Sequence, residues 1–377
     1  MNPLLWEVNW GLVVFCVFAL VVLIQLYYHW WFFRRIAFFT PTEKNKSQTH
    51  PVSVIVCARD EAANLARNLP GVLVQTYPTT HEVIVVNDNS VDESKYIIAE
   101  LQKSFKNLQH VQLTHEAKGI PGKKYPLSIG IKEARHEIVL LTDADCVPAT
   151  EHWIQKMQEG YEEGIEVVIG YGAYHKKPGL LNKLIRFETF QSALQYLSFA
   201  QAGIPYMGVG RNLSYKKGLF FKVKGFSSMN HIPSGDDDLF INKVATRQNT
   251  AIVIDPDAVI LSEPKKTFRD WFHQKTRHFT TARFYRPLHK LLLGLYTFSQ
   301  FLLYPAFIGA LLLFDWRIAS AVFAVRMISY FSVYTRALKK LGEADLAGWL
   351  PLMDVWQFFY YIIFAPALWK KPRPTWN

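Results

Sequence analysis

Charged residues and cysteine are both scarce in this sequence of 377 residues. Only 19% of the residues are charged, below the quarter or so that soluble domains carry. Half of the residues are hydrophobic and 15% are aromatic, which excludes a disordered protein. Three widely spaced cysteines exclude the disulfide framework of a small secreted domain. The chain also lacks internal repeats, and its length suits about two domains of roughly 150 residues each.

The first long apolar run, Trp10–Phe33, has no formal charge. A helix of this length would rise about 36 Å, enough to cross a bilayer core of about 30 Å. A secretory signal peptide fits this run poorly, because the apolar stretch is too long, no basic segment precedes it and no small-residue cleavage site follows it. Arg34 and Arg35 follow the run, so the positive-inside rule places the next domain in the cytoplasm. We predict a membrane anchor over 1–36 and a polar linker over 37–50.

Further apolar segments lie near the C-terminus, and we expect two to three spans within 289–377. The segments are Leu291–Phe314, Ile318–Thr335 and Trp349–Trp369. The second contains Arg326 and the third Asp354, and charges inside a membrane are costly unless they are paired. The two side chains are therefore candidates for an ion pair. Three crossings would place the basic tail outside, against the positive-inside rule, whereas a re-entrant last segment would keep it in the cytoplasm.

The positive charge of the chain is concentrated in its C-terminal third. Residues 264–377 hold 16 Lys and Arg but only 5 Asp and Glu, which accounts for the whole formal charge of +11. Within this part, 265–288 is a basic and amphipathic segment expected to form a helix at the membrane surface. Anionic lipid headgroups are the natural partners of such charge. The charge distribution therefore argues against a nucleic-acid partner.

Between the apolar ends, residues 51–264 read as an α/β domain. β-branched apolar runs bounded by polar turns predict strands over 52–57, 82–87, 137–143 and 166–170. Helical patterns alternate with them, over 61–73, 92–105, 124–135 and 149–159. This alternation predicts a Rossmann-like, mostly parallel sheet, with ligands bound at the carboxyl ends of its strands.

Carboxylates follow three of the predicted strands. Asp143 and Asp145 end the strand EIVLLTDAD, and residues two apart in an extended segment project the same way. Such a pair suits Mg²⁺, which binds few protein oxygens together with the phosphates of a substrate. Asp88 and Glu61 follow the two other strands, although Asp88 lies beside Ser90 and Asp92, residues that also suit helix capping.

Two loops carry further charged clusters. Lys123 lies in the loop AKGIPGKKYP, where a lysine before a helix is a plausible phosphate ligand. A run of three acids, Asp236 to Asp238, precedes the apolar sequence LFI, which predicts the start of a helix with the acids at its positive end. One of these acids is a candidate general base toward a hydroxyl group.

In this order, the motifs resemble those of membrane-bound inverting glycosyltransferases of family two, the relatives of cellulose, chitin and hyaluronan synthases. The resemblance covers residues 50–290, through the segments PVSVIVCARDE, VIVVNDNSVDES, GKKYPLSIG, LLTDADC, GRN, SGDDDL and QKTRH. It implies a GT-A fold with flanking transmembrane helices, a nucleotide diphosphate sugar as donor with UDP as the expected nucleotide, and Mg²⁺ or Mn²⁺ as cofactor. The family includes enzymes that export polysaccharides, but three or four apolar segments are few for such export, so we favour a membrane-associated lipid or glycan as acceptor. The apolar segments predict a multi-pass protein of the plasma membrane.

The resemblance assigns roles residue by residue. The donor site would comprise Glu61, Asp88, Lys123, Asp143 and His278, and the metal would bind Asp143 and Asp145. The catalytic group would comprise Asp236 as the base, with Asp237 as the alternative, and Gln274 and Arg277 of the Q-x-x-R-W motif.

The sequence also departs from the family at three positions. Asn87 replaces the first acid of the usual pair, Gly235 replaces the glutamate before the base, and His278 stands in place of tryptophan. The last two departures keep open a membrane-anchored nucleotide-sugar binding protein without catalysis. A processive polysaccharide synthase that acts with other subunits is the other alternative to single transfer.

Overall fold

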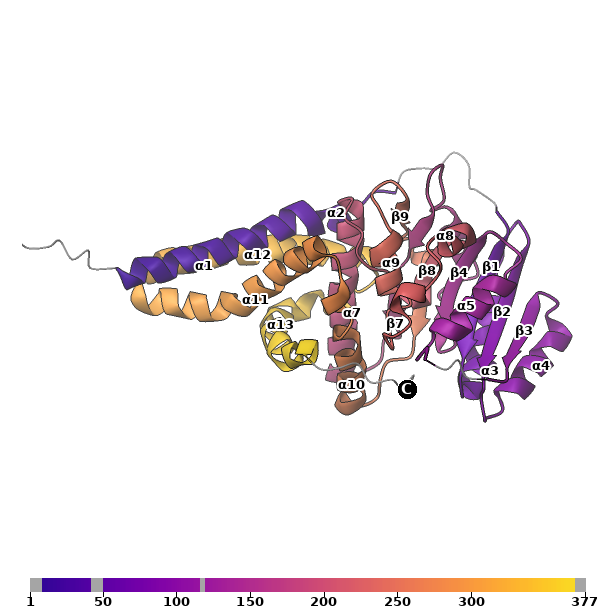
Figure 1. Ribbon diagram of the computed structural model, residues 1–377. Coiled ribbons are helices and arrows are strands. Elements are labelled where there is room, and N and C mark those ends of the chain that lie inside the picture. The colour runs from indigo at the N-terminus through magenta and orange to yellow at the C-terminus, as the bar shows by residue number, and fades with distance from the viewer. Residues whose placement is uncertain (1–8, 42–49, 116–118, 370–377) are drawn as a thin grey trace, which may run out of the picture. The chain divides into compact units, whose positions relative to one another are not determined.

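The computed structural model describes residues 9–41, 50–115 and 119–369, which form two compact units (Figure 1). One unit draws on Met1–Phe39 and Arg286–Pro366, and the other on Thr40–Tyr285 and the segment from Ala367. Over its described residues the first unit is helical, whereas the second combines helices with two sheets.

A sheet of seven strands forms the centre of the α/β unit, in the order β3-β2-β1-β4-β8-β6-β9. Neighbouring strands are parallel except at β8, which runs antiparallel to both β4 and β6. The strands are β1 Val52–Ala58, β2 His81–Asp88, β3 Leu108–Leu113, β4 Ile138–Asp143, β6 Val167–Ile169, β8 Leu213–Lys216 and β9 Thr250–Ile252. The predicted α/β fold with a mostly parallel sheet is confirmed.

The continuous apolar runs of the central strands follow from their burial on both faces. Every residue of β1 is buried, as are the seven residues Glu82–Asp88 of β2, because helices cover both sides of a parallel sheet. The edge strand β3 and the antiparallel β8 were not predicted from sequence. Their residues alternate or mix polar and apolar types, LQHVQL and LSYK, so neither gives a strong apolar run.

A second, small sheet begins directly after β4. It comprises β5 Cys146–Pro148, β10 Ile260–Ser262 and β7 Gly172–Tyr174, in that order. β10 pairs antiparallel with β5 and parallel with β7. Asp143 ends β4 and Asp145 directly precedes β5, so the two carboxylates lie where the chain passes from one sheet to the other.

Helices alternate with the first strands as the sequence pattern predicts. They are α3 Ala62–Leu73, α4 Ser94–Ser104, α5 Lys124–Glu133 and α6 Trp153–Gln158. α6 is shorter than the predicted 149–159, because the residues before it form a bend and a turn. Further along the chain lie α7 Leu180–Gln201, α8 Lys217–Lys222, α9 Asp238–Val244 and α10 Phe268–Phe279. α10 falls within the predicted amphipathic segment.

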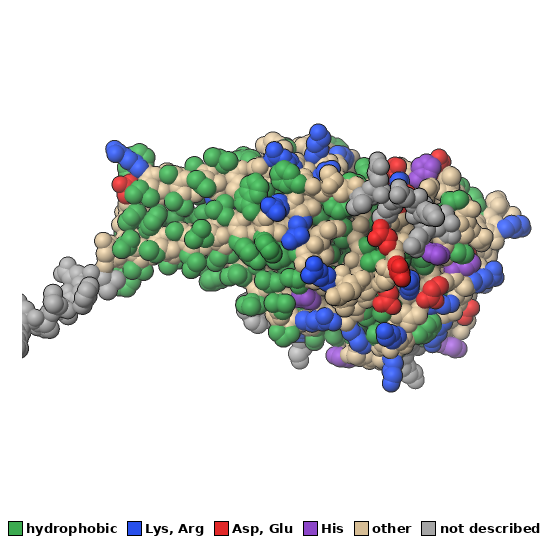
Figure 2. Space-filling model, turned by 90° about the horizontal axis from the view of Figure 1, so that it is seen from above, with side chains coloured by type: hydrophobic (Ala, Val, Ile, Leu, Met, Phe, Trp, Pro, Cys, Tyr) green, Lys and Arg blue, Asp and Glu red, His purple; other side chains and the backbone are tan. Residues whose placement is uncertain are grey.

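Within its described residues, the helical unit contains three helices that are long and apolar enough to cross a membrane. They are Trp10–Ala37, Pro287–Leu313 (α11) and Trp316–Lys340 (α12). The first comprises α1 Trp10–Tyr27, a π-helical turn Tyr28–Phe33 and α2 Arg34–Ala37. Figure 2 shows hydrophobic side chains covering the face of these helices that is turned to the viewer. Leu23 and Leu312 are more than half exposed. An aqueous surface would not favour such apolar exposure.

The last apolar segment is too short to be a fourth candidate span. It folds as a 3₁₀ turn Ala344–Trp349, the helix α13 Leu350–Phe364 and a second 3₁₀ turn Ala365–Trp369. With 15 residues, α13 is about 22 Å long, less than a bilayer core of about 30 Å. The C-terminal region thus supplies two candidate spans, the lower of the predicted numbers.

A polar network lies in the middle of the helical unit. The guanidinium of Arg326 donates to both carboxylate oxygens of Asp354, at 2.6 and 2.7 Å, and neither side chain is exposed. Its Nε donates to Gln25 of α1 at 2.6 Å, and the hydroxyl of Tyr304 on α11 donates to Asp354 at 2.7 Å. The expected pair therefore exists, and it connects four helices.

Removing one member of this pair should strongly destabilise the protein. We expect Arg326→Met to lower the free energy of unfolding by about 3–5 kcal/mol, because the Asp354 carboxylate stays buried without its cation. Adding Asp354→Leu should recover most of the loss. Unfolding in detergent micelles checks both variants against Arg317→Met, an exposed position on α12. A single variant as stable as the wild type would contradict the prediction.

Candidate functional site

The carboxyl ends of β1, β2 and β4 meet at one edge of the main sheet. Cys57 of β1 lies in register with Val86 of β2 and with Asp143 of β4. The residues that follow each strand are therefore neighbours, as the parallel order predicts. This edge brings together the acidic groups that the sequence places after three separate strands.

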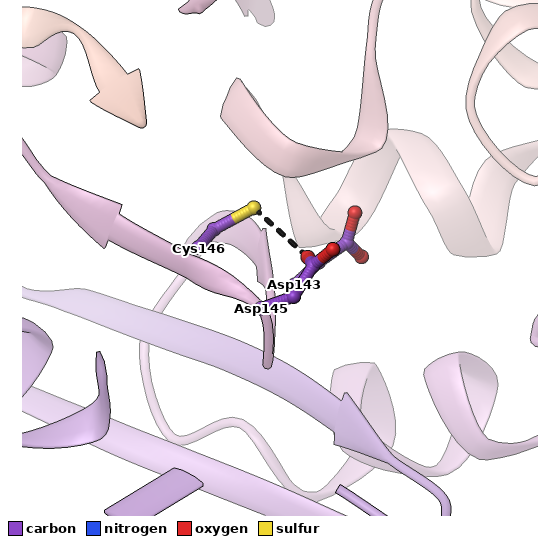
Figure 3. A group of neighbouring side chains, drawn as sticks. All are labelled: Asp143, Asp145 and Cys146. Carbon is purple, nitrogen blue, oxygen red and sulfur yellow. Dashed lines mark hydrogen bonds between the residues drawn. The ribbon is translucent and has the colours of Figure 1, made fainter. Parts of the chain in front are cut away.

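Asp143 and Asp145 form the centre of the site (Figure 3). With Cys146 they form a group whose potential ligand atoms all lie within 4.8 Å of one another. The Cys146 thiol lies 3.3 Å from an oxygen of Asp145 and 2.9 Å from the hydroxyl of Ser262. Two carboxylates at this separation are suitable ligands for Mg²⁺ or Mn²⁺.

The two carboxylates differ in their electrostatic surroundings. Burial disfavours the charge of Asp143, but the ion pair with Lys123 outweighs burial and lowers the pKa of Asp143. Burial and the neighbouring charge of Asp143 raise the pKa of Asp145. Within the described residues Asp145 has no ion-pair partner, so a divalent cation would supply the charge that this carboxylate lacks. The site thus fits a metal ion.

Asp88 and Glu61 border this pair. Asp88 is 5% exposed and accepts a hydrogen bond from the side-chain amide of Asn89 at 2.9 Å. One of its carboxylate oxygens lies 3.9 Å from the Arg59 guanidinium. Glu61 accepts from Asn64 at 2.5 Å. Burial raises the pKa of Glu61, and the charges of Asp145 and Asp143 act in the same direction. The structure therefore brings Glu61 into electrostatic contact with the aspartate pair.

Hydrogen bonds join the loops that carry Glu61 and Asp88. The Asp60 amide donates to the Ser90 hydroxyl at 2.9 Å, and the Val91 amide donates to the Asp60 carboxylate at 2.8 Å. Asp92 accepts from the amides of Ala62 and Ser94, at the starts of α3 and α4. Asp92 therefore satisfies backbone amides at the starts of both helices, as a capping side chain does.

Asn87 has one hydrogen-bond partner, Gln112, that an ionised aspartate would not satisfy. Its side chain is fully buried, donates to Gln112 at 2.9 Å and accepts from the Ser90 amide at 3.3 Å. We expect Asn87→Asp, which restores the family's usual residue, to destabilise the domain by about 1–3 kcal/mol, because Gln112 loses its donor. Thermal unfolding checks this, and the loss should shrink at acidic pH, where a protonated carboxyl donates again. Equal loss at both pH values would contradict the explanation.

The three adjacent acids have different roles. Asp238 is buried and accepts from Thr281 at 2.5 Å and from Tyr285 at 2.8 Å. Asp237 caps α9 and accepts from the amides of Gly210 and Asp238, both at 2.7 Å. Burial, with the charges of Asp236 and Asp238, raises the pKa of Asp237 to about 7. Both residues are thus held by structural hydrogen bonds.

Asp236 is the acid of the three without such bonds. Among the residues that the structure describes, none donates a hydrogen bond to its carboxylate, and the side chain is partly exposed. Burial opposes the charge of Lys123, but Asp143, and more weakly Asp236, raise the pKa of this lysine. Asp236 therefore lies within electrostatic reach of the group around Asp143, with both of its oxygens available.

The backbone explains why glycine precedes this acid. Gly235 has a φ of +94°, a conformation that side-chain-bearing residues rarely adopt. A Cβ at this position would also overlap the side chain of Leu239. The local turn therefore excludes the glutamate that the family has there.

α10 contributes the residues of the QKTR segment. The side-chain amide of Gln274 donates to the Tyr174 hydroxyl at 3.4 Å. The charge of Arg277 contributes to the lowered pKa of Asp143. Lys275 of α10 forms a largely buried ion pair with Glu188 of α7. This ion pair joins α10 to α7. The side chain of His278 lies outside the described residues, so its predicted role stays a prediction.

The sequence reasoning missed Arg211. Its guanidinium donates to the Gly172 carbonyl at 2.7 Å and lies 4.7 Å from the centre of the Tyr174 ring. Its charge favours ionisation of both Asp143 and Asp145. The motif GRN marks this residue in the sequence, but only the fold places it beside the aspartates.

A family model decides the classification of the domain. Residues 53–225 match the model described as "Glycosyl transferase family 2". The chain carries a glycosyl transferase family 2 domain. The match confirms the predicted family-two domain and the predicted enzyme class, a glycosyltransferase. The matched segment contains Glu61, Asp88, Lys123, Asp143 and Asp145.

Known relatives of this glycosyltransferase agree with that assignment. Over 303 residues it is 25% identical to the "Probable glycosyltransferase YdaM" of Bacillus subtilis, covering 75% of this chain and 68% of that protein. It is 32% identical over 101 residues to the "Beta-monoglucosyldiacylglycerol synthase" of Nostoc, covering 26% of this chain and 21% of that protein. The alignment thus spans about a fifth of the Nostoc protein.

A solved structure shares the fold of the glycosyltransferase. This structure is titled "Mannosyltransferase PcManGT from Pyrobaculum calidifontis in complex with GDP-Man and Mn2+". The similarity covers 92% of this chain and 99% of that chain, with a TM-score of 0.58 and 18% sequence identity. The predicted GT-A fold is thereby confirmed.

Proposed function

We propose that this glycosyltransferase moves a sugar from a nucleotide diphosphate donor to a membrane-associated lipid or glycan, with inversion at the anomeric carbon. The observation that carries the proposal is the arrangement of Asp143, Asp145, Lys123 and Asp236 at the carboxyl edge of the sheet. This edge combines a carboxylate pair for a metal ion, cations for a diphosphate, and a carboxylate without structural hydrogen bonds. Those are the parts that a single displacement requires.

The donor site follows from the charges along this edge. Glu61 and Asp88 would bind the nucleoside, and UDP is the expected nucleotide. Asp143 and Asp145 would hold Mg²⁺ or Mn²⁺, which when bound acts as a Lewis acid on the leaving diphosphate. Lys123 and Arg277 would donate to phosphate oxygens as negative charge grows on them.

The acceptor would be activated by Asp236. Its carboxylate would take the proton of the acceptor hydroxyl while that oxygen bonds to the anomeric carbon and the bond to the diphosphate breaks. One displacement inverts the carbon, and the diphosphate leaves without needing a proton from an acid. Gln274 would help to orient the acceptor, because its side-chain oxygen is buried without a hydrogen-bond partner among the described residues.

The acceptor class and the location rest on the apolar helices. Three candidate spans support a multi-pass protein of the plasma membrane, with the glycosyltransferase domain on the cytoplasmic side. The diacylglycerol in the name of the Nostoc relative supports a lipid acceptor. Three spans are few for a channel that exports a polysaccharide, so we favour single transfer.

A donor screen tests the proposed function. Purified protein would be incubated with UDP-sugars and GDP-sugars, Mn²⁺ or Mg²⁺ and a lipid extract, and the products analysed by mass spectrometry. A lipid that gains one sugar would support the proposal, whereas a ladder of products would indicate a processive synthase. If the protein neither transfers sugar from any donor nor hydrolyses any donor, the proposal is overturned in favour of a binding protein.

A further inference from the structure

Lys124 is a buried lysine to which neither the family resemblance nor the mechanism gives a role. It is the first residue of α5, and its side chain is only 1% exposed. Lysine is seldom fully buried unless its ammonium is paired. Here the ammonium donates to two main-chain carbonyls, those of Ile232 at 2.5 Å and Ser234 at 2.6 Å.

These carbonyls belong to the loop that leads to Asp236. The loop runs from the 3₁₀ turn Ser227–Met229 to the start of α9, with Ser234 two residues before Asp236. Burial lowers the pKa of Lys124, and the charge of Asp236 acts against this shift. The lysine is therefore bonded to the backbone of the loop and lies within electrostatic reach of its acid.

The same loop is in contact with the residue two positions before Lys124. A Cβ built on Gly122 would overlap the carbonyl oxygen of Pro233, and the φ of Gly122 is +78°. The backbone at Gly122 and the ammonium of Lys124 thus hold one loop at two neighbouring points. Only glycine permits the first of these contacts at this distance and backbone conformation.

The preceding lysine points toward the other half of the site. Lys123 is the N-cap residue of α5 and pairs with Asp143. The side chains of adjacent residues at the start of a helix do not lie on the same helix face. The side chains of Lys123 and Lys124 therefore point in different directions. Lys123 is bonded to Asp143, and Lys124 is bonded to the loop of Asp236. The dipeptide Lys123-Lys124 thus connects Asp143 to the loop of Asp236. The distance between these two carboxylates would set the distance between the bound donor and the acceptor hydroxyl.

We propose that Lys124 is a positioning residue, which fixes the loop of Asp236 relative to the Asp143–Asp145 pair. The inference rests on the proposed function, in which Asp236 is the base. A base that is displaced by about 1 Å can lose roughly 10²-fold in rate. Lys124 therefore acts on turnover through the backbone of the loop and does not touch the donor.

Lys124→Met tests this proposal, because methionine keeps the aliphatic part of the side chain and removes its donors. We expect kcat for transfer to fall by about 10- to 100-fold. Binding of UDP or GDP with Mn²⁺ should match the wild type. Lys132→Met, an exposed position on the same helix, is the matched control and should keep wild-type turnover. Unchanged turnover in Lys124→Met, or nucleotide binding lost in parallel with turnover, would overturn the proposal.

Hydrogen exchange of the full-length protein provides a readout that needs no substrate. The amides of Ile232, Asp238 and Leu239 are hydrogen-bonded within or beside the loop. They should exchange faster in Lys124→Met, while amides of β4 keep their protection. Wild-type protection at these three amides would overturn the proposal. If the wild type transfers no sugar at all, the proposed function fails, and this measurement still decides whether Lys124 holds the loop.

Gly122→Ala disturbs the second contact without changing Lys124. We expect the same pattern, with lower kcat, unchanged nucleotide binding and faster exchange at the three amides. It also decides the matter if Lys124→Met does not fold. If Gly122→Ala keeps full turnover and wild-type protection of the three amides, the contact between Gly122 and Pro233 does not fix the loop. That result would contradict the proposal.

Discussion

Asp236→Asn is expected to lower the rate of sugar transfer by about 10²- to 10⁴-fold, the range for loss of a general base. The substitution removes a proton acceptor and keeps the size of the side chain. It breaks no structural hydrogen bond, since none reaches this carboxylate from the described residues. Donor binding should therefore stay at the wild-type level, as measured by calorimetry with Mn²⁺. Steady-state turnover of the same protein gives the rate.

Asp237→Asn is the matched control for this prediction. An asparagine can still cap α9, but one of the two amides bonded to Asp237 loses its acceptor. We expect a loss of about 1 kcal/mol in stability and a smaller loss of turnover than in Asp236→Asn. Full turnover in Asp236→Asn would exclude that residue as the base. A larger loss in a folded Asp237→Asn would move the assignment to Asp237.

The acid triplet shows what sequence could and could not predict. Three adjacent acids before an apolar segment predicted a helix start, and α9 begins at Asp238. The division of roles among them depends on distant residues. Thr281 and Tyr285, which bind Asp238, lie 43 and 47 residues further along the chain. No local pattern indicates such partners, so the sequence alone left the choice between Asp236 and Asp237 open.

The aspartate pair was easier to predict because its position follows from local rules. A buried parallel strand gives a continuous apolar run, and a parallel sheet aligns the ends of such runs. β1, β2 and β4 follow both rules, so the acids after them could be expected at one edge. Arg211 could not be expected there, because β7 and α7 separate it in sequence from the aspartates. Only the folded chain brings it back to the site.

The pairing of the charged residues in the helical unit could also be predicted from the sequence. An arginine and an aspartate in separate apolar runs were expected to pair, because each is costly alone. The pair exists, yet the run that contains Asp354 is not among the candidate spans of the described residues. Its helix ends at Phe364 after 15 residues and is bordered by 3₁₀ turns. Hydropathy alone does not distinguish a buried or re-entrant helix of this length from a span.

Asp145→Ala is expected to abolish the dependence of donor binding on the metal ion. Asp143 is neutralised by Lys123, so Asp145 is the carboxylate of the pair that still lacks a cation. Without it, donor affinity in Mn²⁺ should fall more than about 100-fold, to the value measured in the presence of a chelator. Calorimetric titration with UDP-sugars and GDP-sugars, with and without Mn²⁺, measures both quantities.

Cys146→Ser distinguishes the aspartates from the third member of their group. Burial raises the pKa of the Cys146 thiol well above its usual value, with Asp145 and Asp143 acting in the same direction. The thiol also has a hydrogen-bond partner in Ser262. A metal ligand must be a thiolate, so we expect Cys146→Ser to keep the full response to Mn²⁺. A response retained in Asp145→Ala but lost in Cys146→Ser would assign the ion to the thiol, and the charge argument for Asp145 would be wrong.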